Sequence, residues 1–187
     1  MPRPNRSAEK REALLPVLAE AFATVGYRRA TTAELARRCG VQETILYRLW
    51  PDKKGMFLAA IDHVFERSLS IWDALLEARG RGTGAERILS HEAVHHGEFG
   101  LYRVLFTGLD EVDDEELREH LRATYRRFQR YVRDRIVEHR AARGIEDGVD
   151  PDAAAWAILG LGTISSIGRE VGLLTTAARR NLLAEVG

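Results

Sequence analysis

An all-α fold is predicted for this chain of 187 residues by three features of its sequence. Apolar residues recur three and four positions apart through almost every segment, which is the spacing of one face of a helix. No stretch sustains the alternation of apolar and polar residues that marks a half-buried strand. Capping residues, glycines and prolines divide the periodic segments into separate helices. We therefore expect helices throughout and no sheet.

The first predicted helix carries one apolar stripe and ends before Gly26, which stands where a C-terminal cap is expected. Pro16 lies inside this stripe. It predicts either a kink or a late helix start, because proline removes a backbone N–H and clashes with the preceding turn. The stripe consists of Leu14, Leu15, Leu18, Ala21, Phe22 and Val25.

Two short helices are predicted next. Residues 31–34 read Thr-Thr-Ala-Glu, the S/T-x-x-E form of a capping box, and open a helix that ends near Cys39. Gly40 makes a sharp turn, because glycine adopts backbone angles that other residues resist. A third helix follows at 41–50. Two such helices, with the small Ala36 at their crossing, have the form of a helix-turn-helix, although a plain αα-corner shares this layout.

The rest of the chain is also helical in pattern. An apolar face runs from residue 52 to residue 77, with Asp52 as its N-cap, so this helix is long. The glycine-rich residues 79–84 are interpreted as a plain loop, because a phosphate-binding loop needs a preceding strand and the sequence G-K-[ST]. We expect no cofactor. An acidic turn is predicted at 110–116. Further helices are predicted at about 85–97, 99–109, 115–142, 151–170 and 176–186.

Charge is unevenly distributed along the chain. Residues 1–54 hold 11 Lys or Arg against 6 Asp or Glu, whereas the remainder holds 17 against 22. A basic N-terminal part on an acidic body is typical of a nucleic-acid-binding module attached to another domain. Ordinary scatter of surface charge is the alternative.

The sequence also predicts where the protein resides. The first 12 residues are polar and charged, unlike a signal peptide, and no apolar run reaches the 18 residues that a membrane span needs. A single cysteine, Cys39, excludes an internal disulfide and a cysteine zinc site. We expect a cytoplasmic protein without membrane contact.

Four short patterns stand at fixed places between residues 12 and 60. They are F-x-x-x-G-[YF], T-T-x-x-[LI]-A, G-V-x-x-x-x-[LI]-Y and [FW]-P-x-K, and with them the chain resembles the TetR family of bacterial transcriptional regulators. Beyond residue 60 only length and helical layout agree. The matching residues are Phe22, Gly26, Tyr27, Thr31, Thr32, Leu35, Ala36, Gly40, Val41, Leu46, Tyr47, Trp50, Pro51 and Lys53.

The resemblance implies a domain organisation and a function. A three-helix helix-turn-helix DNA-binding domain, residues 1–54, would be joined by the long helix to a helical-bundle effector-binding and dimerisation domain, residues 55–187. The protein would be a sequence-specific transcriptional regulator and not an enzyme. It would repress by binding a palindromic operator in double-stranded DNA as a homodimer, and a small-molecule effector of unknown identity would release it.

The resemblance also implies roles for residues of the helix-turn-helix. Thr32, Tyr47 and Lys53 would bind DNA phosphates, and the start of the recognition helix would enter the major groove. Arg48 would reach a guanine edge or a phosphate. Four departures from the family pattern put the operator sequence in doubt. Gln42 replaces a serine or threonine cap, and Glu43 a basic or small residue. Leu49 stands where an aromatic residue or histidine is common, and Pro16 is atypical in the first helix. The candidate DNA-binding residues are Thr32, Gln42, Glu43, Thr44, Tyr47, Arg48 and Lys53.

Two further sites are expected in the body. Aromatic side chains on the middle helices would line an effector pocket, although a dry core uses the same residues. Small residues in the helix at 151–170 would let a partner subunit's helix approach, although packing within one chain is the alternative. The pocket candidates are Phe65, Trp72, His91, His95, Phe99, Tyr102, Phe106, Tyr125 and Phe128. The dimer candidates are Trp156, Leu159, Gly160, Gly162, Leu182 and Leu183.

One motif points to another class of protein. His91, Glu92 and His95 match H-E-x-x-H, in which two histidines on one helical face bind zinc and the glutamate activates water. A zinc hydrolase also needs a third ligand and usually a strand that aligns the substrate, and neither is predicted. We expect neither a catalytic site nor a bound metal. A metal-binding protein using His91 and His95 remains the alternative function, as a sensor or a hydrolase.

Overall fold

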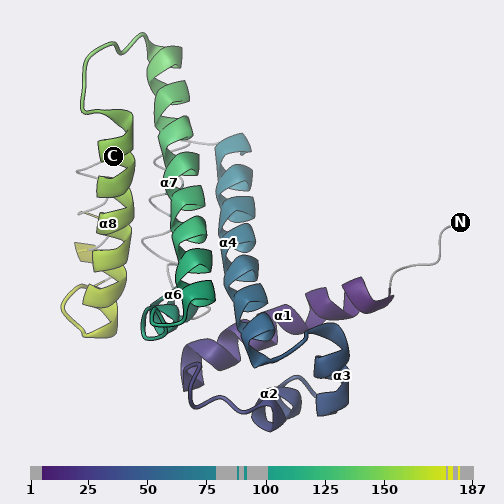
Figure 1. The fold of residues 1–187 in the computed structure, drawn as a ribbon. Helices are drawn as coiled ribbons and strands as arrows, with labels where there is room; N and C mark the ends of the chain where they lie inside the picture. The colour runs from purple at the N-terminus through teal and green to yellow at the C-terminus, as the bar shows by residue number, and fades with distance from the viewer. Residues whose placement is uncertain are drawn as a thin grey trace, which may run out of the picture. The chain divides into compact units, whose positions relative to one another are not determined.

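The computed structural model describes residues 6–78, 88, 91, 101–175, 177–178 and 181. Seven helices are numbered as in Figure 1, and no strand occurs among these residues, so the all-α prediction is confirmed. The helices are α1 (Arg6–Val25), α2 (Thr32–Arg38), α3 (Glu43–Leu49), α4 (Lys53–Glu77), α6 (Leu101–Leu109), α7 (Glu115–Arg143) and α8 (Pro151–Glu170). The helices expected at 85–97 and 176–186 lie almost wholly outside the described residues.

The chain divides into two compact units. Unit 1 comprises Met1–Leu69 with Gly97–Leu121, and unit 2 comprises Ser70–His96 with Arg122–Gly187. Helices α4 and α7 each begin in unit 1 and continue into unit 2. The expected domain boundary after residue 54 does not coincide with a border between these two compact units. It marks the end of the expected DNA-binding domain and stays a prediction.

Local sequence signals account for three helix ends outside the helix-turn-helix. Asp52 and Asp150 accept hydrogen bonds through Oδ1 from the backbone N–H groups of Gly55 (2.7 Å) and Ala153 (3.0 Å), so both predicted N-caps are confirmed. Gly26 ends α1 with φ +85°, and its N–H donates to the carbonyl of Phe22 at 2.9 Å. These caps fix where α1 stops and where α4 and α8 begin.

Pro16 does not delay the start of α1. The helix begins at Arg6 and contains Pro16 in its interior, so the expectation of a late start is wrong. Proline forfeits one hydrogen bond inside a helix, and the apolar side of α1 offsets this loss, because Leu18 and Phe22 are completely buried.

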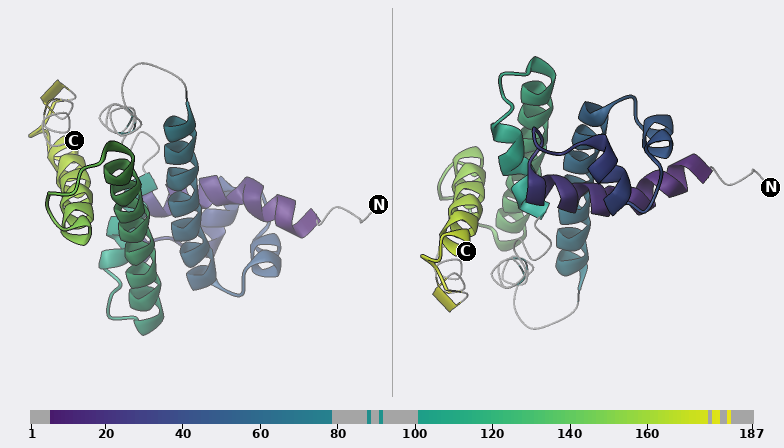
Figure 2. Two further views of the ribbon diagram at one scale, coloured as in Figure 1. Left: turned by 90° about the horizontal axis from the view of Figure 1, so that it is seen from above. Right: turned by 90° about the horizontal axis from the view of Figure 1, so that it is seen from below.

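The core of unit 1 lies between the first four helices and α6. Figure 1 shows α2 and α3 grouped with α1 at the start of α4, and Figure 2 shows the same group from two further sides. The Phe22 and Phe57 rings meet edge to face with centroids 4.9 Å apart, and α6 packs against α1. A Cβ atom at Gly108 would lie 3.0 Å from Leu121, so glycine permits the close approach of α6 and α7.

Unit 2 has an aromatic centre. The Trp72 ring on α4 lies 5.8 Å from the rings of both Phe128 and Tyr131 on α7, measured between centroids. The Tyr131 hydroxyl donates to Asp73 Oδ1 at 2.5 Å. Burial, followed by this hydrogen bond to a carboxylate, raises the pKa of Tyr131 above its ordinary value. These contacts join α4 and α7 within unit 2.

Candidate nucleic-acid interface

The helix-turn-helix is closed by a cap and a glycine turn. Thr31 is the N-cap of α2, and its Oγ1 accepts the Glu34 N–H at 3.2 Å. Gly40 has φ +63°, and the N–H of Val41 donates to the carbonyl of Ala36 at 3.0 Å. Ala36 is buried, as expected of a small residue at a helix crossing. The turn therefore depends on the residues from which it was predicted.

Helix α3 has one buried side and one exposed side. Leu46, Leu49 and Trp50 at its C-cap are buried. Gln42 is the N-cap but makes no side-chain capping hydrogen bond. Residues three and four apart share a helix face, so most of the exposed candidates form one surface. The exposed residues are Gln42, Glu43, Thr44, Tyr47 and Arg48.

Two predicted phosphate-binding hydroxyls lie together. The Tyr47 hydroxyl on α3 donates to Thr32 Oγ1, in the first turn of α2, at 3.1 Å. Tyr47 is 49% exposed, so its hydroxyl is accessible as well as paired. Thr32 lies at a helix N-terminus, where backbone N–H groups favour an anion. Because the Tyr47 proton is directed at Thr32 Oγ1, the proton of the Thr32 hydroxyl remains to be donated to a phosphate oxygen.

Lys53, the third predicted phosphate ligand, is already engaged. Its Nζ donates to the carbonyls of Tyr27 (2.9 Å) and Ala30 (3.0 Å) and lies 4.5 Å from the centroid of the Tyr27 ring. The ammonium therefore connects the first turn of α4 to the segment between α1 and α2. Since an ammonium has three N–H groups, one remains for a phosphate.

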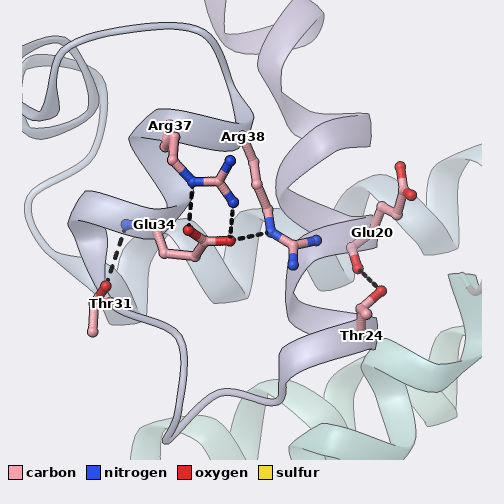
Figure 3. Close-up of polar contacts among 6 residues, drawn as sticks. All are labelled: Glu20, Thr24, Thr31, Glu34, Arg37 and Arg38. Carbon is pink, nitrogen blue, oxygen red and sulfur yellow. Dashed lines mark hydrogen bonds and ion pairs between the residues drawn. The ribbon is translucent and has the colours of Figure 1, made fainter.

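Three charged side chains on α2, Glu34, Arg37 and Arg38, form a cluster that was not predicted from the sequence (Figure 3). Glu34 accepts hydrogen bonds from Arg37 (2.8 Å) and Arg38 (2.7 Å), and these contacts hold the pKa of its carboxyl at about 2. Only half of the predicted capping box forms, because Thr31 caps Glu34 while the Glu34 side chain turns to the two arginines. Spacings of three and four residues predict such pairs.

The acidic residues at the turn between α6 and α7 form ion pairs with two basic side chains of unit 1. Arg28 donates to both carboxylate oxygens of Glu111, at 2.9 and 3.1 Å. Lys54 pairs with Asp114 (2.8 Å) and Glu116 (2.9 Å), and hydrogen bonds to these carboxylates raise its pKa. Neither cation was singled out in the sequence, because nothing in the local spacing connects them to residues 110–116.

The effector-pocket candidates are distributed over both units. In unit 1, Phe65 is buried and Phe106 half-buried. In unit 2, Trp72 and Phe128 are buried in mutual contact, and burial raises the pKa of the half-buried Tyr125. His91 is half-buried. His95, Phe99 and the side chain of Tyr102 lie outside the described residues, and the pocket stays a prediction.

The H-E-x-x-H motif is only partly described. Among the residues that the structure describes, no group of three His, Cys, Asp or Glu side chains could hold a metal ion. Glu92 and His95 lie outside the described residues. The structure therefore leaves a metal-sensing role for these histidines untested.

Helix α8 carries an exposed apolar stripe on the side away from the core of unit 2. Ser165 and Ser166 are buried, whereas large apolar residues are exposed, which reverses the usual pattern for a helix on a single chain. A Cβ atom at Gly160 or Gly162 would meet none of the described residues within 4 Å, and Leu159 is half-buried. Leu182 and Leu183 lie outside the described residues. The exposed stripe consists of Trp156, Gly160, Ile164, Ile167 and Val171.

The all-helical fold and the exposed face of α3 are those of a helix-turn-helix DNA-binding protein. The sequence of residues 14–60 matches the family described as bacterial regulatory proteins, tetR family. The chain is 30% identical over 143 residues to the nucleoid occlusion factor SlmA of Marinobacter nauticus, covering 75% of this chain and 73% of that protein.

Solved structures share the fold. A putative TetR-family transcriptional regulator from Rhodococcus sp. superposes with a TM-score of 0.75 at 24% identity, covering 95% of this chain and 96% of that one. AibR, solved in complex with isovaleryl coenzyme A and operator DNA, superposes with a TM-score of 0.67 at 16% identity, covering 95% and 96%.

The chain belongs to the TetR family of bacterial regulatory proteins. It is a DNA-binding transcriptional regulator and not an enzyme. Family membership thus excludes the zinc-hydrolase alternative, and it confirms the resemblance on which the expected roles of the DNA-binding residues were based. Those individual roles remain predictions.

Proposed function

We propose that the protein is a repressor that binds a palindromic operator as a homodimer and leaves it when a small-molecule effector binds. The observation that carries this proposal is the exposed face of α3 beside the Tyr47–Thr32 hydroxyl pair, 3.1 Å apart. A regulator needs groups that read bases next to groups that hold the backbone in register. Here both kinds lie on one short helix and the adjoining N-terminus of α2.

The two kinds of contact fall to different residues. The hydroxyls of Tyr47 and Thr32 bind one phosphate, and Arg48 reaches a guanine edge or a neighbouring phosphate. Glu43, at the start of α3, faces a base pair that offers a donor such as cytosine N4, since a carboxylate repels phosphate. Gln42 and Thr44 complete the base-reading edge. Lys53 adds its remaining N–H to the backbone contacts.

The exposed stripe of α8 supports the homodimer. Trp156 is 51% exposed and Ile164 54% exposed in the single chain, and apolar surface gathered on one helix face is typical of an interface. Glycines 160 and 162 leave room for a partner helix. A two-fold dimer places its two recognition helices about 34 Å apart, one turn of DNA, which matches a palindrome.

Effector release is supported by the aromatic centre of unit 2 and by α4. Trp72 contacts Phe128, and α4 carries Trp72 on the same continuous helix that begins at Lys53. The structure of AibR holds both an acyl coenzyme A and operator DNA, so this fold accommodates both kinds of ligand. We propose an apolar effector bound near Trp72.

We also propose that the protein acts in the cytoplasm, because a transcriptional regulator binds the DNA there. No helix among the described residues is long and apolar enough to cross a membrane.

Selection of duplexes from a randomised pool tests the proposal. We expect enrichment of an inverted repeat whose half-sites lie one helical turn apart, and dimer-sized complexes in gel-shift titration. Random enrichment, or half-sites without symmetry, would contradict operator binding by a two-fold dimer. Trp72→Ala should change the affinity of an effector found by screening while leaving operator affinity without effector nearly unchanged.

A second candidate role is that of the relatives named nucleoid occlusion factor SlmA. The likeness covers 75% of this chain rather than the helix-turn-helix alone, which favours this candidate. Mapping the bound sites along the chromosome separates the two roles. A repressor of few genes occupies few promoter sites, whereas a factor acting on the nucleoid occupies many dispersed sites.

A further inference from the structure

The recognition helix is too short to hold its own position. Helix α3 has seven residues, and isolated helices of this length do not persist in water. Leu46 and Leu49 anchor its inner side by burial, but apolar contact is non-directional and permits small rotations of the helix. Reading base edges requires directional hydrogen bonds with narrow geometry. The Tyr47–Thr32 hydrogen bond links the exposed side of α3 to α2, and a directional contact at the C-terminal end of α3 would complete the fixing of its orientation.

The C-terminal end of α3 is left open by the sequence. Trp50 adopts an extended backbone, φ −133° and ψ 144°, as the residue before a proline prefers. Pro51 brings no N–H. The carbonyl of Leu49, in the last helical position, is one of the acceptors that a helix C-terminus leaves without a partner inside the helix.

Arg11 occupies this end. Its Nη2 donates to the carbonyl of Leu49, across 38 positions of the chain, and its guanidinium carbon lies 5.8 Å from the centroid of the Trp50 ring. A cation at a helix C-terminus is also favoured by the helix dipole, and an arginine within about 6 Å of an indole ring gains a cation–π attraction. Three interactions of one side chain therefore act on the last turn of α3.

We infer that Arg11 is a positioning residue for DNA recognition, which fixes the orientation of α3 from the first half of α1. This inference rests on the proposed function of α3 as the base-reading helix. Phosphate contacts tolerate a small tilt of α3 better than base contacts do, because a phosphate accepts donors from many directions. Loss of Arg11 should therefore reduce affinity for the operator more than affinity for unrelated DNA.

Three variants with one changed cation each test the inference. Arg11→Gln removes the charge and the guanidinium, Arg11→Lys keeps a charged donor, and Arg143→Gln removes an exposed charge from the end of α7 as the control. The probes are a duplex selected by the wild-type protein from a randomised pool and a scrambled duplex of the same composition. Each affinity is measured over a series of salt concentrations.

We expect Arg11→Gln to bind the selected duplex roughly tenfold more weakly, with little change for the scrambled duplex, as for loss of one charge-assisted hydrogen bond. The slope of affinity against salt should stay unchanged, Arg11→Lys should recover part of the loss, and Arg143→Gln should behave as wild type. A parallel loss for both duplexes, with a slope reduced by about one, would show a phosphate contact instead and overturn the inference.

A second readout does not depend on DNA. The Trp50 N–H donates to the carbonyl of Leu46 at 2.8 Å, so exchange of this amide with solvent reports on the last turn of α3. We expect faster exchange in Arg11→Gln and an intermediate rate in Arg11→Lys. Unchanged exchange in both would overturn the inference even if no operator were found, whereas failure to select any operator would count against the proposed function alone.

Discussion

The substitution Gly160→Leu should weaken the dimer without lowering the stability of the single chain. Gly160 is exposed, and a Cβ atom there would meet none of the described residues within 4 Å, so a side chain added at this position begins in open space. Replacing glycine by leucine inside a helix favours the folded chain by up to about 1 kcal/mol. The isolated subunit should therefore be as stable as wild type or slightly more stable.

The dimer should respond in the opposite direction. Overpacking costs about 1–3 kcal/mol at each site, and a two-fold interface contains the site twice, so the dimer loses about 2–6 kcal/mol. Since about 1.4 kcal/mol corresponds to tenfold, the dissociation constant should rise at least about thirtyfold. Sedimentation over a range of concentrations measures this constant, and thermal unfolding at low concentration measures the chain.

Gly168→Ala is the matched control on the same helix. A Cβ atom there would lie 2.6 Å from Cδ1 and 2.8 Å from Cγ of Leu174. The Leu174 backbone is held in place, because its N–H donates to the carbonyl of Gly168 at 3.0 Å, so the clash can be relieved only by another rotamer of the Leu174 side chain. This variant should destabilise the chain itself. If Gly160→Leu dimerised as tightly as wild type, or if wild type were monomeric at micromolar concentration, the assignment of the α8 stripe to the dimer would be refuted.

Three further predictions concern unit 1. Tyr47→Phe and Thr32→Val should each weaken DNA binding by about 1 kcal/mol in gel-shift titration, since each removes one hydroxyl from the shared phosphate site; equal affinity would contradict that site. Leu46→Ala should lower the free energy of unfolding in urea by about 2–5 kcal/mol, because the side chain is fully buried. The lowered pKa of Glu34 stabilises the folded state above pH 4.5, and this contribution should be lost as pH falls from 4.5 towards 2. Glu34→Gln should remove that part of the pH dependence, and an unchanged acid limb of the unfolding curve would contradict it.

The sequence predicted those parts of the fold that depend on neighbours along the chain. The turn at Gly40, the caps at Asp52 and Asp150 and the long helix α4 follow from local spacing, and the structure confirms them. Of the two outcomes predicted at Pro16, a kink or a late start of α1, the late start is wrong, because proline is tolerated where burial on both sides of it outweighs one missing hydrogen bond.

Contacts between distant segments were not predictable in this way. The partners of Lys53 are backbone carbonyls, which leave no trace in residue identity. Arg11 and Leu49 stand 38 positions apart, and Arg28 and Glu111 stand 83 apart. The periodicity of apolar residues predicts which side of a helix is buried, so the exposed face of α3 was predictable. It does not predict which distant side chain contacts the end of the helix, so the contact of Arg11 with α3 was not.

The tether made by Lys53 has a consequence for how the DNA-binding module tolerates sequence change. Both of its hydrogen-bond acceptors, at Tyr27 and Ala30, belong to the main chain. A substitution at either position can alter ring contacts or packing, but every amino acid supplies the same carbonyl oxygen. The two hydrogen bonds of the tether therefore place no demand on the side chains at positions 27 and 30, and the Tyr27 ring adds a separate contact with the ammonium, 4.5 Å away. The requirement falls on one partner only, the long cationic side chain at position 53.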